Sequence, residues 1–389
     1  MAPTWALYIH IPFCEHKCVY CDFYSVTQKE LLNGFNQALL QEIDQYSHNP
    51  PHGGFSISTL YLGGGTPSLM TPAHLQQILD AVAKNFSLCS DAEITLEANP
   101  GAMEIRHLAD FYRLGINRLS LGVQSFHDQE LHQLSRIHTA ADATQAIRAA
   151  RQARFDNLSL DLIFAIPGQT LASWQSTLTQ AIAFQPEHLS CYSLTIEAAT
   201  PLGHAVQEGH VQPCDEELER ELFILGQEKL QQAVYEHYEI SNYCRPSFRS
   251  KHNQSYWQET PYLGLGPSAH SFDGHRRWWN IRDINRYLDA LAQNQSVVAE
   301  AETLTPAQQM AESILLGLRR VEGVDLSLSH YLLPAITAMG GTDSQTQAFQ
   351  PSANGKLFTL HDDRLALTRE GLLIYNHICE KLCSQITSL

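Results

Sequence analysis

Three cysteines stand close together near the start of the chain, as Cys14-x-x-x-Cys18-x-x-Cys21. The apolar, β-branched run Leu7–Ile11 precedes them, so the thiols lie in the loop after a predicted strand. Cysteine thiolates hold iron–sulfur clusters, and a [4Fe–4S] centre that only transfers electrons normally uses four of them. Three thiolates leave one iron open, as metal sites do when a substrate must coordinate. The spacing therefore predicts a [4Fe–4S] cluster with one open iron.

A zinc site is the competing interpretation of the same cysteines. Zinc in proteins is usually tetrahedral, so three thiolates would need a fourth ligand. His10 and His16 are near enough in the sequence to supply it. The loop position and the missing fourth cysteine favour the cluster, and zinc stays open as the alternative.

Six short apolar or β-branched runs recur in the first half of the chain, each followed by a loop and then by a helical pattern. Strand and helix in alternation imply parallel strands with right-handed crossovers. Six units are too few for a closed eight-fold barrel, which leaves a partial (β/α)6 TIM-like barrel or an open doubly wound sheet. The predicted strands are Leu7–Ile11, Ile57–Leu62, Ile94–Glu97, Arg118–Val123, Leu158–Phe164 and Leu189–Ile196.

The positions of unusual residues favour the partial barrel. Cys14, the glycines at 63–65, Glu97, Gln124 and Asp161 all fall at or just beyond the ends of predicted strands. Active sites of barrels are built at that face, from strand ends and the loops that follow them. We therefore expect these residues, which come from five successive units, to converge on one site.

The pattern changes after about residue 200. The stretch Tyr235–Tyr243 and the segment around Gly264 give no regular prediction, whereas later helices and a hairpin around Asp362-Asp363 predict a small α+β, winged-helix-like unit. Residues 338–354, rich in Gly, Thr, Ser and Gln, predict a mobile loop. The predicted helices are 215–235, 305–319 and 369–383, and the predicted divisions are a barrel at 1–235, a connecting region at 236–300 and a C-terminal domain at 301–389.

Composition narrows the class of partner. The 389 residues include 41 acidic and 25 basic side chains, a net charge of −16, and no basic block, which argues against a nucleic-acid substrate. No apolar run reaches the length of a spanning helix, and the first residues do not resemble a signal peptide. Nine scattered cysteines predict a reducing compartment without disulfides. We expect a cytoplasmic protein, with peripheral contact at a membrane surface left open.

The cysteine segment resembles a known family. Cx3Cx2C after the first strand of a partial barrel is the hallmark of radical S-adenosylmethionine (SAM) proteins. Tyr8-Ile9-His10-Ile11-Pro12-Phe13-Cys14 and Cys18-Val19-Tyr20-Cys21-Asp22-Phe23-Tyr24-Ser25 are similar to the oxygen-independent coproporphyrinogen III oxidase branch. The resemblance implies that the amine and carboxylate of SAM bind the open iron, and that the reduced cluster cleaves its carbon–sulfur bond to give a 5′-deoxyadenosyl radical.

The same resemblance assigns further side chains to SAM. Gly63-Gly64-Gly65-Thr66-Pro67 is similar to the family segment that contacts the amino group, although a tight turn explains a glycine run equally well. An Arg can pair with the methionyl carboxylate, and acids can accept from the ribose hydroxyls. His10 resembles a histidine near the cluster, or it is structural. The implied SAM contacts are Tyr8, Tyr20, Gly64, Gly65, Thr66, Glu97, Gln124, Arg136 and Asp161.

Two features separate the members of this branch. The pattern typical of the oxidases has a fourth cysteine two residues after the third, and this chain has Phe23 at that position. The segment His252-Asn253-Gln254-Ser255-Tyr256-Trp257, together with Ala269-His270-Ser271, is similar to HemW-like heme chaperones. Imidazole and phenol groups are known heme ligands, and aromatic rings suit a flat macrocycle. The resemblance implies a heme region at His252, Tyr256, Trp257 and His270; the alternative is an aromatic-capped packing loop.

These observations lead to a functional hypothesis with named alternatives. The first is a heme chaperone that binds a [4Fe–4S] cluster, SAM and heme, and delivers heme to acceptors such as respiratory hemoproteins, with an electron donor for the cluster. The second is an enzyme, a radical SAM decarboxylase of coproporphyrinogen III propionates. The third is an RNA-modifying radical enzyme, which the acidity disfavours. No residue is assigned a catalytic role, and whether the chain is an enzyme stays open.

Overall fold

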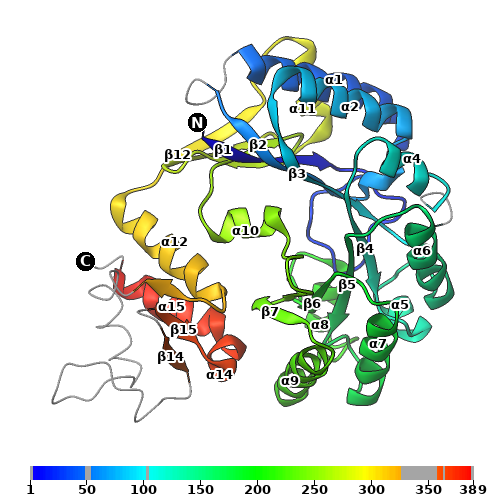
Figure 1. Ribbon diagram of the computed structural model, residues 1–389, viewed down its shortest axis with the longest axis vertical. Coiled ribbons are helices and arrows are strands. Elements are labelled where there is room, and N and C mark those ends of the chain that lie inside the picture. The colour runs from blue at the N-terminus through cyan, green and yellow to red at the C-terminus, as the bar shows by residue number, and fades with distance from the viewer. Residues whose placement is uncertain (1–2, 49–53, 102–104, 326–356, 362–363, 387–389) are drawn as a thin grey trace.

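Six parallel strands form the centre of a twelve-stranded sheet in the computed structural model, which describes residues 3–48, 54–101, 105–325, 357–361 and 364–386. Their order in the sheet follows the chain, and helices cover the outer face of the curved sheet (Figure 1). This confirms the partial barrel. The strands are β1 (Thr4–Ile11), β2 (Ser56–Gly64), β3 (Ser87–Ala98), β4 (Arg118–Gln124), β5 (Leu158–Phe164) and β6 (His188–Ser193).

The helices between these strands begin at side-chain caps. Thr71 accepts a hydrogen bond from the backbone N–H of His74, with Pro72 at the first helical position, as the sequence predicts. Thr139 and Thr170 each form a capping box at the start of a later helix. The outer helices are α1 (Leu32–His48), α2 (Pro72–Asn85), α4 (Leu108–Arg113), α5 (Asp128–Gln133), α6 (Ala140–Gln152) and α7 (Leu171–Ala183).

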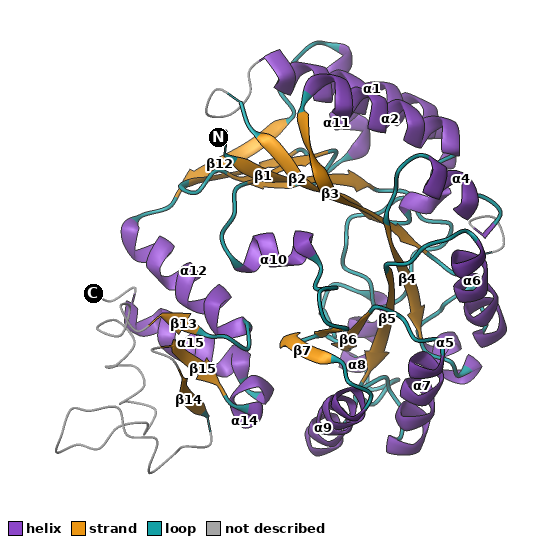
Figure 2. Ribbon diagram, viewed as in Figure 1, coloured by secondary structure: helices purple, strands orange, loops and turns teal. Residues whose placement is uncertain are grey.

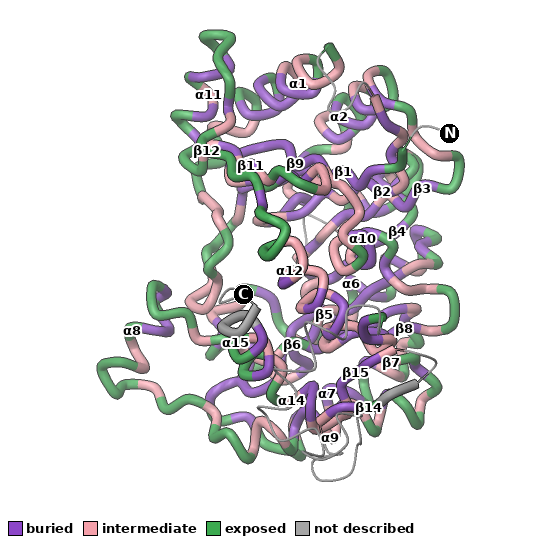
Figure 3. The backbone as a smooth tube through the Cα atoms, turned by 90° about the vertical axis from the view of Figure 1, so that its left-hand side faces the viewer, coloured by how far each residue is buried: buried purple, intermediate pink, exposed green. Residues whose placement is uncertain are grey.

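The two faces of the central strands differ in polarity. In β4, the apolar residues Leu119, Leu121 and Val123 are buried in the hydrophobic core. The alternate residues, Arg118, Ser120, Gly122 and Gln124, line a cavity inside the barrel. Successive side chains of a strand point to opposite faces, so this alternation places a polar lining on the concave face of the sheet. Figure 3 shows that the chain is mostly buried along these strands.

Six further strands extend the sheet at both edges, where the sequence predicts no regular structure. β9 is parallel to its partner β1, and β8 is antiparallel to its partner β6. The prediction of irregular structure around Tyr235–Tyr243 and Gly264 is wrong, because β8 and β9 are stabilised by pairing with the distant strands β6 and β1, and short neighbouring strands then pair with them. The added strands are β7 (Glu236–Glu239), β8 (Asn242–Cys244), β9 (Tyr262–Leu265), β10 (His270–Phe272), β11 (Arg276–Asn280) and β12 (Val298–Thr303).

A short helix, α10 (Lys251–Trp257), lies inside the curve of the strands instead of outside it (Figure 2). The Ser250 side chain caps its first turn by accepting from the N–H of Asn253. The buried carboxylate of Glu93, on β3, accepts from the backbone N–H groups of Lys251 and His252 at 3.2 and 3.1 Å. A negative charge at a helix N-terminus is favourable, so β3 fixes α10 inside the barrel. Three more helices, α8 (Pro201–Gln207), α9 (Glu216–Gln232) and α11 (Ile284–Ala292), complete this part.

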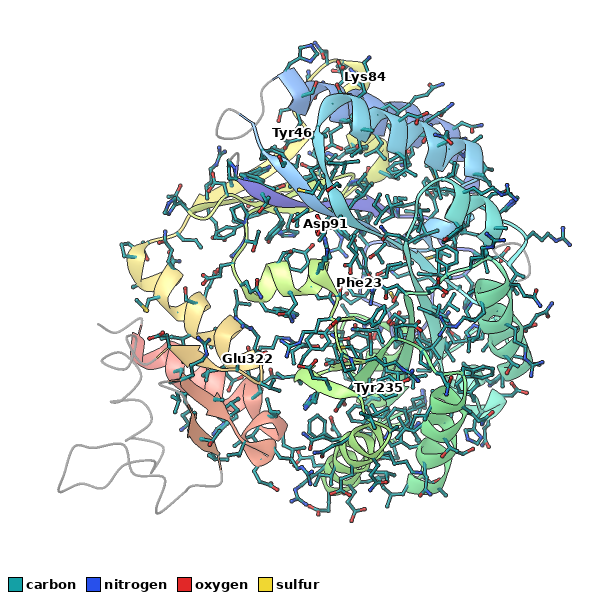
Figure 4. All side chains as sticks on the ribbon, viewed as in Figure 1. Phe23, Tyr46, Lys84, Asp91, Tyr235 and Glu322 are labelled. Carbon is teal, nitrogen blue, oxygen red and sulfur yellow. The ribbon has the colours of Figure 1, made fainter. Side chains whose placement is uncertain are left out.

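The C-terminal unit has its own sheet, in the order β13-β15-β14, which confirms the predicted hairpin and the α+β unit. Arg319 pairs with the buried Glu239 of β7 at 2.8 Å, and Arg249 pairs with Glu322, which is labelled in Figure 4. These ion pairs join the unit to the edge of the large sheet. The predicted loop at 338–354 lies outside the described residues. The elements are α12 (Pro306–Arg319), β13 (Val324–Asp325), β14 (Phe358–His361), β15 (Arg364–Leu367), α14 (Arg369–Leu373) and α15 (Tyr375–Ile386).

The length and apolarity of the helices show whether any of them could span a membrane. Among the described residues, none of them has the length and apolarity needed to cross a bilayer.

Gly266, just after β9, offers a test of how tightly the added strands fit. Its φ is +91°, and a Cβ there would lie 2.4 Å from the backbone oxygen of His10. Gly274 has a φ of +100°, but a Cβ there would have no atom within 4 Å, so this position isolates the backbone effect. We expect Gly274→Ala to lower the free energy of unfolding by about 1–2 kcal/mol. Gly266→Ala should cost about 2 kcal/mol more, because it also forces a clash.

Urea denaturation of the two glycine variants and the wild type gives these free energies. Equal losses for the two variants would show that the backbone around β9 gives way freely, contrary to this packing.

Candidate functional site

The cysteine loop is fixed at both of its ends. Cys14 N–H donates to the carbonyl of Val26 at 2.9 Å, and Val26 N–H donates to the carbonyl of Pro12 at 2.7 Å. In the middle of the loop, Val19 N–H donates to the Ser135 hydroxyl at 2.9 Å. Because these bonds close the loop on itself and on the barrel, the positions of its thiols are set by backbone geometry.

The three cysteines line one cavity of about 600 Å³, which we call the main cavity. Thr66 Oγ1 donates to Cys14 Sγ at 3.7 Å, and Arg136 Nη1 donates to Cys18 Sγ at 3.5 Å. Burial raises the pKa of the Cys14 and Cys21 thiols, and the hydrogen bond from Thr66 opposes this at Cys14. Within the described ranges, no three His, Cys, Asp or Glu side chains are gathered tightly enough to hold a single metal ion. The thiols line a common cavity, and the hydrogen bond from Thr66 favours the thiolate form of Cys14.

The glycine segment after β2 brings backbone against this loop. Gly65 N–H donates to the carbonyl of Ile11 at 2.9 Å, and a Cβ on Gly65 would lie 2.6 Å from the carbonyl oxygen of Phe13. Gly64 has a φ of +117°, and a Cβ there would meet the His10 ring at 2.7 Å. Only glycine fits at these two positions without displacing the His10 ring or the start of the cysteine loop. The glycines therefore serve close packing, and they also leave backbone exposed to the main cavity.

Two partly buried carboxylates face the main cavity. Glu97 accepts from the Tyr61 hydroxyl at 2.7 Å and from Gly64 N–H at 3.1 Å, and burial raises its pKa to about 7. Asp161 accepts from the Ser120 hydroxyl at 2.9 Å, and burial raises its pKa as well. Each carboxylate can accept further hydrogen bonds from a hydroxyl or amino group in the cavity.

Arg136 lies between the thiols and the barrel wall. Its Nη2 donates to the carbonyl of Gly122 at 3.1 Å and to Asn99 Oδ1, while its Nε has no hydrogen-bond partner. Nearby, Gln124 ends β4 with a φ of +64°, which turns the chain at the cavity edge. A partly buried guanidinium beside the thiols is a group that can bind a carboxylate.

The main cavity gathers eleven of the twelve residues that the sequence assigns to the cluster and SAM. They are Cys14, Cys18, Cys21, Tyr20, Gly64, Gly65, Thr66, Glu97, Gln124, Arg136 and Asp161. Tyr8 is not among the lining residues of this cavity. Its hydroxyl is 3.0 Å from His10 Nδ1, and it lines a separate cavity.

The lining of the main cavity also includes residues that were not predicted as site residues, among them Tyr61, Asn99 and Arg118. Arg118 is 2% exposed and its Nε has no hydrogen-bond partner. On β4, Arg118, Ser120 and Gln124 alternate with apolar residues, and this pattern could have predicted that their side chains face the inside of the barrel. Asn99 directly follows the predicted strand that ends at Glu97, and could have been included on the same grounds.

A second cavity, of about 350 Å³, lies beside the first. Asp22 and Phe23 line both, and Phe23, labelled in Figure 4, is 71% exposed. The remaining lining residues of this second cavity are mainly aromatic or cationic. They are Tyr8, His10, Tyr24, Tyr256, Tyr262, Ser268, Ala269, His270 and Arg282.

The predicted heme residues lie in different surroundings. His252 is 1% exposed, with Nδ1 at 2.8 Å from the Thr59 hydroxyl and Nε2 at 2.9 Å from the Tyr256 hydroxyl, and burial lowers its pKa to about 3. The ring of Trp257 packs against the Arg319 guanidinium, 4.4 Å away. Tyr256 and His270 line the second cavity. The structure thus brings two of the four residues to one cavity and holds His252 and Trp257 in packing contacts.

The sequence has known relatives that cover most of its length. A family model described as the radical SAM superfamily matches residues 8–181. The chain is 40% identical to a heme chaperone HemW of Synechocystis sp. over 329 residues, 83% of this chain and 80% of that protein. It is 34% identical to a heme chaperone HemW of Bacillus subtilis over 323 residues, 82% of this chain and 84% of that protein.

The fold has a close counterpart among solved structures. Coproporphyrinogen III oxidase (HemN) from Escherichia coli, a radical SAM enzyme, matches with a TM-score of 0.81 over 98% of this chain and 90% of that one. The sequence identity in this match is 22%, so the likeness concerns the fold alone.

The raised pKa of Glu97 predicts how the free energy of unfolding depends on pH. The folded protein holds this proton up to about pH 7, whereas an unfolded Glu loses it near its ordinary value of 4.5. The folded state therefore binds more protons between these values, and the free energy of unfolding falls as pH rises through that window. Glu97→Gln removes the buried charge, and its amide can still bond both Tyr61 and Gly64. We expect it to stabilise the ligand-free protein by about 1–3 kcal/mol at pH 8 and to change little at pH 4.5.

Glu42→Gln is the matched comparison, because burial raises the pKa of Glu42 to about 7 as well. Glu42 accepts from Tyr287, Gly266 and Asn280, and an amide cannot accept from all three. This variant should lose stability at both pH values in thermal or urea unfolding. If Glu97→Gln behaves the same way, the Glu97 carboxyl is not the group that titrates near 7.

Proposed function

Because this chain belongs to the HemW family of heme chaperones, within the radical SAM superfamily, we propose that it binds heme and delivers it to acceptor proteins. The observation that carries the proposal is the identity of 34–40% to curated heme chaperones over most of the chain. The lack of a fourth cysteine at position 23, where the chain has Phe23, agrees with it.

The donor set of the main cavity fits the two cofactors of the family, a [4Fe–4S] cluster and SAM. Cys14, Cys18 and Cys21 would hold the cluster, and Thr66 and Arg136 donate to two of the three sulfurs. When bound, the cluster supplies the electron with which radical SAM proteins cleave SAM. We propose that the protein's part is to bind, orient and shield these groups.

The charged side chains in the wall of the main cavity would bind different groups of SAM. Arg136, which donates to Cys18 beside the thiols, would pair with the methionyl carboxylate. Glu97 and Asp161 would accept hydrogen bonds from the amino and hydroxyl groups of SAM. Gly64, Gly65 and Thr66 offer backbone groups, while Tyr20 and Gln124 complete the wall. Tyr8 would act from the second cavity, through its contact with His10.

The partners and location follow the same proposal. Heme is the cargo, and heme-accepting proteins such as respiratory hemoproteins would receive it. An electron donor would reduce the cluster. The net charge of −16 argues against nucleic acid as a partner. We propose a cytoplasmic location, where the cysteines stay reduced, with peripheral contact at a membrane during delivery.

Anaerobic reconstitution tests this proposal. Iron, sulfide, bound SAM and bound heme are counted in the wild type and in Cys14→Ser. We expect the wild type to bind four non-heme iron atoms, SAM and heme, and Cys14→Ser to lose the non-heme iron and SAM while keeping heme, because the second cavity does not include Cys14. Cys89→Ser, which changes a partly buried cysteine outside both cavities, should retain all three.

Turnover separates the chaperone from the alternative oxidase. The reconstituted wild type is incubated without oxygen with a reductant, SAM and coproporphyrinogen III. The proposal expects heme transfer to an apo-hemoprotein and no protoporphyrinogen IX. Formation of protoporphyrinogen IX over many cycles would overturn the chaperone and establish the radical decarboxylase.

A further inference from the structure

The second cavity has features that the cluster and SAM do not use. Its volume of about 350 Å³ falls within the range of small-molecule sites, about 300–1,000 Å³. The rings of Phe23, Tyr24, Tyr256 and Tyr262 line it, and Phe23 exposes 71% of its surface. An exposed aromatic side chain beside an aromatic cavity is a contact surface for a flat apolar ligand.

Three histidines lie at or next to this cavity, and their ring nitrogens differ in what they bond. His10 has Nδ1 at the Tyr8 hydroxyl and Nε2 at the carbonyl of Tyr24, 2.9 Å away. His252 is bonded at both nitrogens to Thr59 and Tyr256. His270 makes no side-chain hydrogen bond within the described part of the chain, and it is exposed. Its imidazole is therefore free to bind a metal ion through a lone pair.

The surroundings of His270 orient its ring. It stacks on Trp279, with ring centroids 5.6 Å apart and an interplanar angle of 26°. Burial and the nearby Arg277 lower its pKa, which keeps the imidazole neutral at physiological pH. A neutral, oriented imidazole is the usual protein ligand of heme iron.

Charge at the rim adds a second contact. Arg282 lines the cavity with its guanidinium over the ring of Tyr24, 5.7 Å from the centroid, and no ion pair is formed by it among the described residues. An exposed, uncompensated guanidinium can pair with a carboxylate. Heme combines an apolar macrocycle, an iron that takes imidazole, and two propionate carboxylates, so it matches the cavity on all three counts.

We propose that the second cavity is the heme site of this chain, in which His270 ligates the iron, Phe23, Tyr24 and Tyr262 contact the macrocycle, and Arg282 pairs with a propionate. The inference rests on the proposed heme-chaperone function and assigns its binding site. It moves the iron ligand from His252, which is locked in the core, to an accessible histidine 18 residues further along. The cavity takes one edge of the macrocycle and leaves the opposite edge for an acceptor protein.

His270→Ala tests the iron ligand. Heme is titrated into the cluster-loaded protein and followed by its absorption spectrum and by electron paramagnetic resonance. We expect the variant to lose the imidazole-ligated spectrum and about tenfold or more in heme affinity, and added imidazole to restore the spectrum. His275→Ala, which changes another exposed histidine near the same hairpin, should match the wild type.

Arg282→Gln tests the propionate contact. Its affinity for heme should fall about two- to fivefold, in line with an exposed ion pair, while its affinity for heme dimethyl ester should equal that of the wild type. Arg286→Gln, on the exposed side of α11 and outside the cavity, serves as the control and should bind both ligands normally.

The outcomes separate this site from the function that it serves. If the wild type binds and transfers heme, while His270→Ala and Arg282→Gln keep its spectrum and affinities, the site assignment is overturned and the chaperone function stands. If the wild type itself neither binds nor transfers heme, the proposed function fails. Circular dichroism of each variant shows whether it folds. The restoration of the heme spectrum by imidazole is measured on the folded fraction of His270→Ala.

Discussion

A buried positive charge at the centre of the barrel governs the chemistry of its interior. Arg118 is 2% exposed, and Glu93, Glu97 and Asp161 lie within its electrostatic reach. Burial raises the pKa values of Glu97 and Asp161, and the charge of Arg118 opposes that rise. Burial lowers the pKa of His252, and Arg118 lowers it further. Burial is therefore the main cause of all three shifts, while Arg118 limits the rise at the two acids and reinforces the neutral form of His252.

The helix α10 turns this interior into two compartments. Its N-terminus is bound to the barrel wall by Glu93, whose two oxygens accept from Lys251 and His252. From that anchor, Asn253 faces the main cavity and Tyr256 faces the second cavity. His252 lies between them and bonds across to Thr59 on β2. The motif His252-Asn253-Gln254-Ser255-Tyr256-Trp257 therefore forms a partition, and its histidine is a structural part of that partition.

The sequence was sufficient for whatever depends on local pattern. Strand–helix alternation predicted all six central strands, and the positions assigned to strand ends predicted that Cys14, Glu97 and Asp161 converge. Asp161 reaches the cavity from the middle of β5, not from its end. The strand β9 was missed because it pairs with β1 across some 250 residues of chain, which no local pattern records. The surroundings of His252 were missed for a related reason. Its partner Thr59 is 193 residues away in the chain. The sequence around a histidine does not show whether its ring nitrogens are hydrogen-bonded or free.

The two cavities share Asp22 and Phe23, and this sharing has a consequence for how they communicate. Phe23 is two residues after Cys21, so a ligand that packs on its ring also restrains the loop that carries the thiols. Restraining a segment for one ligand lowers the entropy that a second ligand must remove, and the effect is reciprocal by linkage. A cysteine at position 23 would place a thiol at this junction; the exposed aromatic ring instead gives both cavities a common wall. The residue that departs from the oxidase pattern is thus one of the two that the cavities share.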